Sequence, residues 1–134
     1  MIPSFNWLLL LLTFGFSTNR PPVPHKGPQL VWQDEFEGRG LPDSSKWSYD
    51  VGGHGWGNNE LQYYTAGRKE NARLENGKLI IEAVREDLEG KSYTSARLVT
   101  RGKGDWQFGR IDVRARIPRG RGTWPAIWML ASSL

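Results

Sequence analysis

Carboxylate pairs are the first residues in this sequence whose types and spacing could do chemistry. Glu35 and Glu37 lie two positions apart, so a strand would carry both side chains on one face. Two acids that flank a sugar–sugar bond are what glycoside hydrolysis requires. Both residues lie where a predicted strand meets a glycine-rich turn. We therefore interpret them as structural surface charges, and we interpret in the same way the acids at another strand end and turn, Glu82, Glu86, Asp87 and Glu89.

Glycine patterns and histidines indicate no other familiar site. The segments GHG at 53–55 and GRG at 120–122 do not open a helix after a strand, so they do not fit a phosphate-binding loop. The chain has no cysteine and two histidines, one in a proline-rich stretch and one in a loop. The sequence therefore predicts neither a transition-metal site nor a nucleophilic triad.

Tryptophans are the more informative set. Trp124 and Trp128 fall on one face of a predicted strand, and Trp56 lies in the loop GGHGWGNN at 52–59. A flat indole packs against the C–H face of a pyranose ring while its N–H bonds a hydroxyl. We interpret these three residues as candidates for sugar binding, and we assign Trp32, Trp47 and Trp106 to the core.

Basic residues are concentrated in the last quarter of the chain. Residues 101–134 hold seven bases and two acids, whereas the net charge of the whole sequence is +4. Such a stretch could bind nucleic acid. However, RIDVRARI at 110–117 alternates apolar and charged residues without a fault, which is the pattern of a half-buried strand with a solvated face. We therefore expect no nucleic-acid partner.

The elements that must position these residues are predicted to be short strands. Gly accounts for 16 of 134 residues and Pro for 8, which favours a turn-rich β protein. Asn76-Gly77 between two apolar runs is the strongest hairpin signal. Strands are predicted at 30–32, 47–51, 61–64, 72–75, 78–85, 92–100, 110–117 and 124–130. This spacing indicates an antiparallel β-sandwich.

Three regions follow from the hydropathy pattern. Residues 1–18 read as a signal peptide, with an uncleaved anchor as the alternative, and residues 19–28 as a proline-rich linker ahead of a domain at 29–134. A secreted, extracellular location is therefore expected, with no membrane association once the leader is removed. The absence of cysteine leaves the domain without disulfides.

Six segments carry a resemblance to a known family. They are LVWQDEFEG at 30–38, SSKWSYDVG at 44–52, GWGNNELQYYT at 55–65, ENGKLIIEAVRE at 75–86, YTSARLVTRGK at 93–103 and FGRIDVRARIPRGRGTWPAIWML at 108–130. In this order they resemble the N-terminal part of family 16 glycoside hydrolases, specifically laminarinase-like endo-β-1,3-glucanases and the related β-glucan recognition proteins. The resemblance implies an all-β, jelly-roll sandwich of the concanavalin-like type, here truncated to about its first half, with an open cleft for β-glucan.

The resemblance also implies where the chemistry lies. Family members carry their catalytic acids in a Glu-Ile-Asp-Ile-Met-Glu type motif just after the strand equivalent to WPAIWML, and this chain ends before that motif. The motif performs a retaining double displacement with carboxylates about 5 Å apart. No catalytic residue is therefore assigned, and the chain alone is expected to be inactive.

Residues carried over to the glucan cleft are Asn58, Arg97, Trp124 and Trp128. Asn58 and Arg97 would bond sugar hydroxyls, and the two indoles would line the subsites beside the cleavage point. The resemblance brings no cofactor and leaves a structural calcium ion open, and we expect no specific protein partner. Two functions stay open: an endo-β-1,3-glucanase, which we prefer, and a non-catalytic β-1,3-glucan recognition protein.

Overall fold

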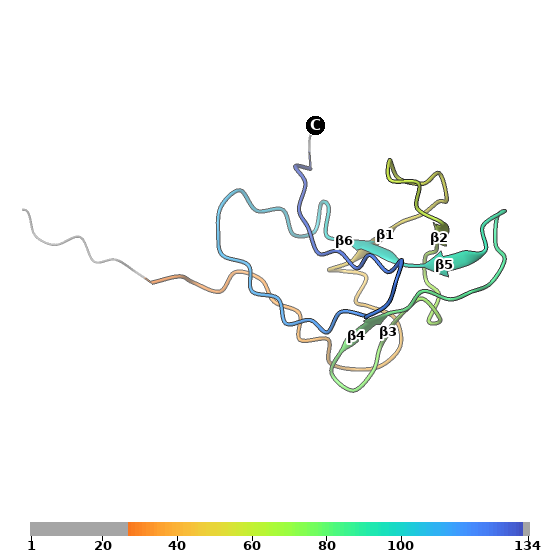
Figure 1. Ribbon diagram of the computed structural model, residues 1–134. Coiled ribbons are helices and arrows are strands. Elements are labelled where there is room, and N and C mark those ends of the chain that lie inside the picture. The colour runs from red at the N-terminus through yellow and green to blue at the C-terminus, as the bar shows by residue number, and fades with distance from the viewer. Residues whose placement is uncertain (1–26, 133–134) are drawn as a thin grey trace, which may run out of the picture. The chain divides into compact units, whose positions relative to one another are not determined.

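The computed structural model describes residues 27–132, and every element below lies in the unit that begins at Val31. These residues form six short strands and no helix, as Figure 1 shows: β1 (Ser48–Asp50), β2 (Gln62–Tyr64), β3 (Ala72–Leu74), β4 (Leu79–Ile81), β5 (Tyr93–Ser95) and β6 (Arg97–Val99). The all-β prediction is confirmed. The predicted leader and most of the predicted linker lie outside the described residues. Within residues 27–132 no helix is long and apolar enough to cross a membrane.

The strands pair in three two-stranded ladders. β1 pairs with β6 and β3 with β4, both antiparallel, whereas β2 pairs with β5 in parallel. The parallel pair departs from the antiparallel arrangement that the sequence predicts. Parallel strands need a long crossover, and the segment between β2 and β5, which contains the whole β3–β4 hairpin, supplies one.

Single bridges connect these ladders. Gly52 and Tyr64 exchange two backbone hydrogen bonds of 3.1 and 3.0 Å, which join the end of β1 to β2. Val84 and Thr94 exchange two bonds of 2.9 Å, which join the segment after β4 to β5. The chain after β1 is thereby tied to β2, and the chain after β4 is tied to β5.

The predicted hairpin is confirmed. Asn76 and Gly77 have φ values of 53° and 67°, as a two-residue type I′ turn requires. Glu75 and Lys78 close the turn with backbone hydrogen bonds of 2.9 and 3.1 Å. The second arm ends at Ile81, which is shorter than the predicted 78–85.

A buried polar network lies between the ladders. Asn71 and Thr94 are fully buried, and Asn71 Nδ2 donates to Thr94 Oγ1 at 2.9 Å. Thr65 Oγ1 donates to Asn71 Oδ1 at 2.7 Å, and Thr94 Oγ1 donates to Glu86 Oε1. Side-chain hydrogen bonds thus connect the end of β2, the start of β3 and β5.

A cluster of aromatic rings forms the second packed region. The Trp32 ring lies 5.8 Å from that of Trp47 and 5.4 Å from that of Trp106, both edge to face. Trp47 Nε1 also donates to Asp34 Oδ2 at 2.7 Å. These contacts agree with the core role that the sequence indicates for the three tryptophans, although their side chains are only half-buried.

The predicted strands at 30–32, 110–117 and 124–130 are absent, and this part of the sequence-based prediction is wrong for the described residues. In Figure 1 the ribbon after β6 carries no arrow. Ile111, Val113 and Ile117 are 54%, 56% and 63% exposed, so the face expected to be half-buried is open. Apolar alternation alone does not form a strand, because the ladder needs a neighbouring backbone to bond to.

Candidate functional site

A tight loop at residues 52–60 builds one side of the site. The backbone N–H groups of Asn58 and Glu60 donate to the Gly55 carbonyl at 2.9 and 3.2 Å. Gly55 is buried with φ at +83°, and a Cβ there would lie 3.4 Å from the Asn59 Cα. Glycine is therefore required at this position, and the turn that it permits places Trp56 over the end of β2.

The Trp56 ring is held on several sides. Its Nε1 donates to the Gly52 carbonyl at 3.2 Å. Its ring lies 5.8 Å from that of Tyr64, edge to face, and 4.3 Å from that of His54. Another side chain lies over the ring face of this indole.

That side chain is Arg97, on β6. Its Cζ lies 4.4 Å from the ring centre of Trp56 and 4.8 Å from that of Trp128, so the guanidinium lies close to two indoles from distant parts of the chain. Arg97 Nε donates to Asp50 Oδ2 at 3.1 Å. The terminal nitrogens Nη1 and Nη2 make no hydrogen bond within residues 27–132.

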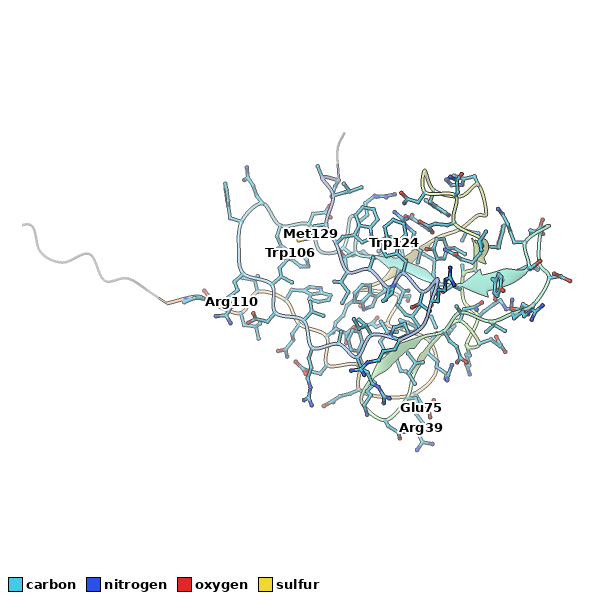
Figure 2. The ribbon with its side chains drawn as sticks, viewed as in Figure 1. Arg39, Glu75, Trp106, Arg110, Trp124 and Met129 are labelled. Carbon is cyan, nitrogen blue, oxygen red and sulfur yellow. The ribbon has the colours of Figure 1, made fainter. Side chains whose placement is uncertain are left out.

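The two C-terminal tryptophans differ in their surroundings. Trp128 contacts Arg97 and is 53% exposed, whereas Trp124 is 72% exposed and has no ring or cation contact within the described part of the chain. Figure 2 shows Trp124 on the strand-free ribbon that follows β6. The structure therefore brings Arg97 and Trp128 together with Trp56, and it does not bring Trp124 into contact with them.

Asn58 lies in the same loop as Trp56 and is exposed. Its Nδ2 is 3.3 Å from Glu60 Oε1 and 3.4 Å from the Trp56 carbonyl. Glu60 Oε2 also accepts hydrogen bonds of 2.7 Å from Gln62 and from the Tyr64 hydroxyl. Burial and the bond to Glu60 raise the pKa of Tyr64 to about 12.

Three polar residues of this site were not singled out from the sequence. Asp50 bonds Arg97 across two strands, and Glu60 and Tyr64 support the Trp56 loop. The signal for Glu60 was present in the sequence, since it ends the GWGNNE segment and precedes Tyr64 by four positions. No local signal could have found Asp50, because its partner lies 47 positions away.

This arrangement suits an uncharged, hydroxyl-rich ring compound. Indoles stack on apolar ring faces, and the free terminal nitrogens of a guanidinium donate to hydroxyl oxygens. The two carboxylates present, Asp50 and Glu60, are both engaged by neighbouring donors. No cluster of three or more His, Asp or Glu residues in the region 27–132 could hold a metal ion, so we assign no residue to calcium.

Two hollows of the described surface lie away from these aromatic rings. One, of about 370 Å³, is lined by Arg39, Lys69 and Arg73 with the hairpin turn, and Figure 2 shows Arg39 beside Glu75 there. The other, of about 510 Å³, is lined by residues 116–119. Neither contains an aromatic side chain, so neither resembles a sugar subsite.

Comparisons with known proteins agree with this chemistry. The chain is 70% identical over 124 residues to a beta-glucanase of Rhodothermus marinus, covering 91% of this chain and 43% of that protein. It is 44% identical over 132 residues to a glucan endo-1,3-beta-glucosidase of Cryptopygus antarcticus, covering 95% and 45%. A crystal structure of a non-specific endo-beta-1,3(4)-glucanase from family GH16, co-crystallized with 1,3-beta-D-cellotriosyl-glucose, is 52% identical with a TM-score of 0.58, covering 60% of this chain and 34% of that one.

A shorter match concerns a protein of another kind. A beta-1,3-glucan-binding protein of Penaeus monodon is 57% identical over 37 residues, which are 28% of this chain and 10% of that protein. No family model matches the chain. The chain spans less than half the length of the two glucanases named above.

Proposed function

Since the chain is homologous to part of the laminarinase-like glucanases of glycoside hydrolase family 16, which are β-jelly rolls, we propose that the surface around Arg97 binds β-1,3-glucan. We call this surface the Arg97 face. The whole protein to which this face belongs acts as an endo-1,3-β-glucanase. Arg97, Trp128 and Trp56 form the central part of the binding surface, Asn58 adds an amide at its edge, and Trp124 extends it along the chain.

One observation carries the proposal. The Arg97 guanidinium lies within 4.8 Å of the ring centres of both Trp56 and Trp128. A planar donor group next to two partly exposed indoles offers stacking surfaces and hydrogen bonds within the span of about one sugar ring. The face carries no free carboxylate, so it is suited to hold a neutral glucan.

The reaction of the proposed enzyme needs more than this face. Retaining hydrolysis uses two carboxyl groups about 5–5.5 Å apart, one as nucleophile and one as acid and base. The 134 residues contain no Glu-X-Asp-X-X-Glu sequence. In this proposal the chain's own residues bind and orient the glucan, and we expect no turnover from these residues alone.

Secretion is part of the proposal. The apolar residues 7–16 direct export, the proline-rich residues 19–28 act as a linker, and the glucan is met outside the cell. The absence of cysteine means that no disulfide is needed for the folded state.

Titration of the 134-residue chain with laminarihexaose, followed by calorimetry and tryptophan fluorescence, tests the proposal. We expect saturable binding, a loss of at least about tenfold in affinity for Arg97→Ala and for Trp128→Ala, and no release of reducing sugar from laminarin. Arg110→Ala is the matched control, because Arg110 is exposed and, within residues 27–132, bonds Asp112 alone. Equal affinity of all variants, or no binding at all, would overturn the assignment of this face.

A second function is favoured by the match to a beta-1,3-glucan-binding protein. In that case the Arg97 face serves recognition alone. Reading the transcript beyond the codon for Leu134 separates the two functions. A following Glu-X-Asp-X-X-Glu sequence supports the enzyme, and a frame that continues with those glutamates replaced supports recognition.

A further inference from the structure

Asp50 and Arg97 lie directly opposite each other in the β1–β6 ladder. Side chains at opposite positions of an antiparallel pair lie on the same face and close together. The two charged side chains are largely withdrawn from solvent, with 15% exposed for Asp50 and 20% for Arg97. The strand register therefore brings the Asp50 carboxylate next to Nε, the guanidinium nitrogen nearest the main chain of Arg97.

The hydrogen bond between Asp50 and Arg97 uses Nε, one of the three guanidinium nitrogens. Asp50 Oδ2 accepts from Nε of Arg97 at 3.1 Å, and no hydrogen bond within residues 27–132 involves Nη1 or Nη2. A guanidinium is planar, so a bond at Nε sets the rotation of the whole group about the side-chain axis. Among the described residues the two terminal nitrogens have no hydrogen-bond acceptor, so both are available to a ligand.

A second cation supports the carboxylate. Asp50 Oδ1 lies 3.8 Å from Nη1 of Arg101, whose side chain is 64% exposed. The two oxygens of Asp50 thus face two different arginines. Only one of these arginines contacts the indoles of the site.

From these contacts we propose that Asp50 is a positioning residue for Arg97. It holds the guanidinium plane against the indoles of Trp56 and Trp128 and directs Nη1 and Nη2 toward the ligand, without touching the ligand itself. The inference deepens the proposed glucan-binding function and rests on it for the identity of the ligand. The orientation of Arg97 in the free protein is independent of that function.

Two consequences distinguish positioning from general support of the fold. Without the carboxylate, Arg97 samples several rotamers, and binding a ligand must then restrict them. We expect Asp50→Asn to weaken laminarihexaose binding about tenfold, because it replaces a charge-assisted hydrogen bond with a weaker neutral one. Asp50→Glu keeps the charge and is expected to recover most of the affinity.

The experiment combines nuclear magnetic resonance of the arginine Nε–H groups with laminarihexaose titration. In the ligand-free wild type we expect a resolved Arg97 Nε–H signal that exchanges slowly with water and shifts when Trp56 or Trp128 is replaced. Asp50→Asn speeds this exchange while the backbone signals of β1 and β6 stay in place, because the neutral amide oxygen is a weaker acceptor, and Asp50→Glu slows it again. Glu82→Gln is the matched control, since Glu82 bonds Arg73 at 2.8 Å and that arginine contacts no indole of the described residues.

Each outcome decides one of the two proposals. Slow Nε–H exchange that depends on Asp50, together with a wild type that does not bind laminarihexaose, keeps the positioning role and overturns glucan binding. Wild-type affinity and an unchanged Arg97 signal in Asp50→Asn overturn the positioning role and leave glucan binding intact. Collapse of the β1 and β6 backbone signals in both Asp50 variants would assign Asp50 to the fold instead.

Discussion

Tyr64 is the residue in this site whose ionisation is most strongly altered. Its hydroxyl donates to Glu60 Oε2 at 2.7 Å and its ring meets Trp56 edge to face. Burial is the main cause and the bond to Glu60 the second cause of a pKa raised from 10.0 to about 12. The neutral phenol is thus the form that supports the Trp56 loop.

The raised pKa predicts a loss of stability in alkali. Between pH 10 and about 12 the folded chain binds more protons at Tyr64 than the unfolded chain does, so the free energy of unfolding falls as the pH rises through this range. Below pH 10 the contribution is fully present. We expect the urea midpoint to stay level up to about pH 10 and to fall between pH 10 and about 12.

Tyr64→Phe is the informative variant, because it removes the titrating group and keeps the ring. Its urea midpoint should fall less than that of the wild type over the same pH range. Tyr49→Phe serves as the comparison, since burial also raises the pKa of Tyr49 but its hydroxyl has no hydrogen-bond partner among the described residues. An identical pH dependence in wild type and Tyr64→Phe contradicts the assignment.

At the scale of elements, the short ladders depend on side-chain hydrogen bonds. The buried hydrophobic residues of the described chain are the two alanines Ala72 and Ala96, whereas Asn71 and Thr94 are fully buried polar residues. Asn71 also donates to the Glu82 carbonyl at 3.3 Å, which ties the end of the hairpin to the network. Polar groups in such a position are costly unless every one of them is bonded.

Replacement of Asn71 by Ala is therefore expected to cost about 2–4 kcal/mol, because it leaves buried partners unbonded as well as removing its own bonds. Thr94→Val alone and the double variant complete a mutant cycle. The two changes should be clearly less than additive, since Asn71 bonds Thr94 directly at 2.9 Å. Additive losses in the urea midpoint would show that the two residues act independently.

The elements also differ in how far their pairing could be predicted. The hairpin was predicted because its signal, Asn76-Gly77 between two apolar runs, is local. The β1–β6 pair joins Ser48 to Val99, and the parallel β2–β5 pair was not anticipated at all. Pairing between distant segments depends on which partner is available in space, and periodicity within one segment does not contain that information.

At the scale of the whole molecule, exposed apolar side chains mark residues 108–130. Phe108 is 87% exposed, Ile117 is 63% exposed, and Ile127, Met129 and Leu130 are each at least 60% exposed. Patches of this kind promote association when they stay uncovered. The alternating segment 110–117 also has backbone groups without strand partners, which can pair with another chain.

We therefore expect the isolated chain to self-associate increasingly as its concentration rises and to bind a hydrophobic dye. Replacement of Ile111 and Val113 by Lys should shift sedimentation toward the monomer and lower dye binding, because it places charge on the exposed face. Arg114→Lys, on the charged side of the same segment, is the control and should change neither. A wild type that stays monomeric with a cooperative thermal transition would contradict this expectation.

The amino-acid sequence by itself determined the all-β class, the hairpin, the tryptophans of the packed cluster and the resemblance to family 16 glucanases, because these depend on residue types and on local spacing. Only the tertiary structure decided that Arg97 lies close to both Trp56 and Trp128, that Asp50 bonds it, and that Trp124 stands apart. Those contacts join residues tens of positions apart. They arise from strand register and loop geometry, which are set by the packing of distant segments and not by the pattern within any one of them.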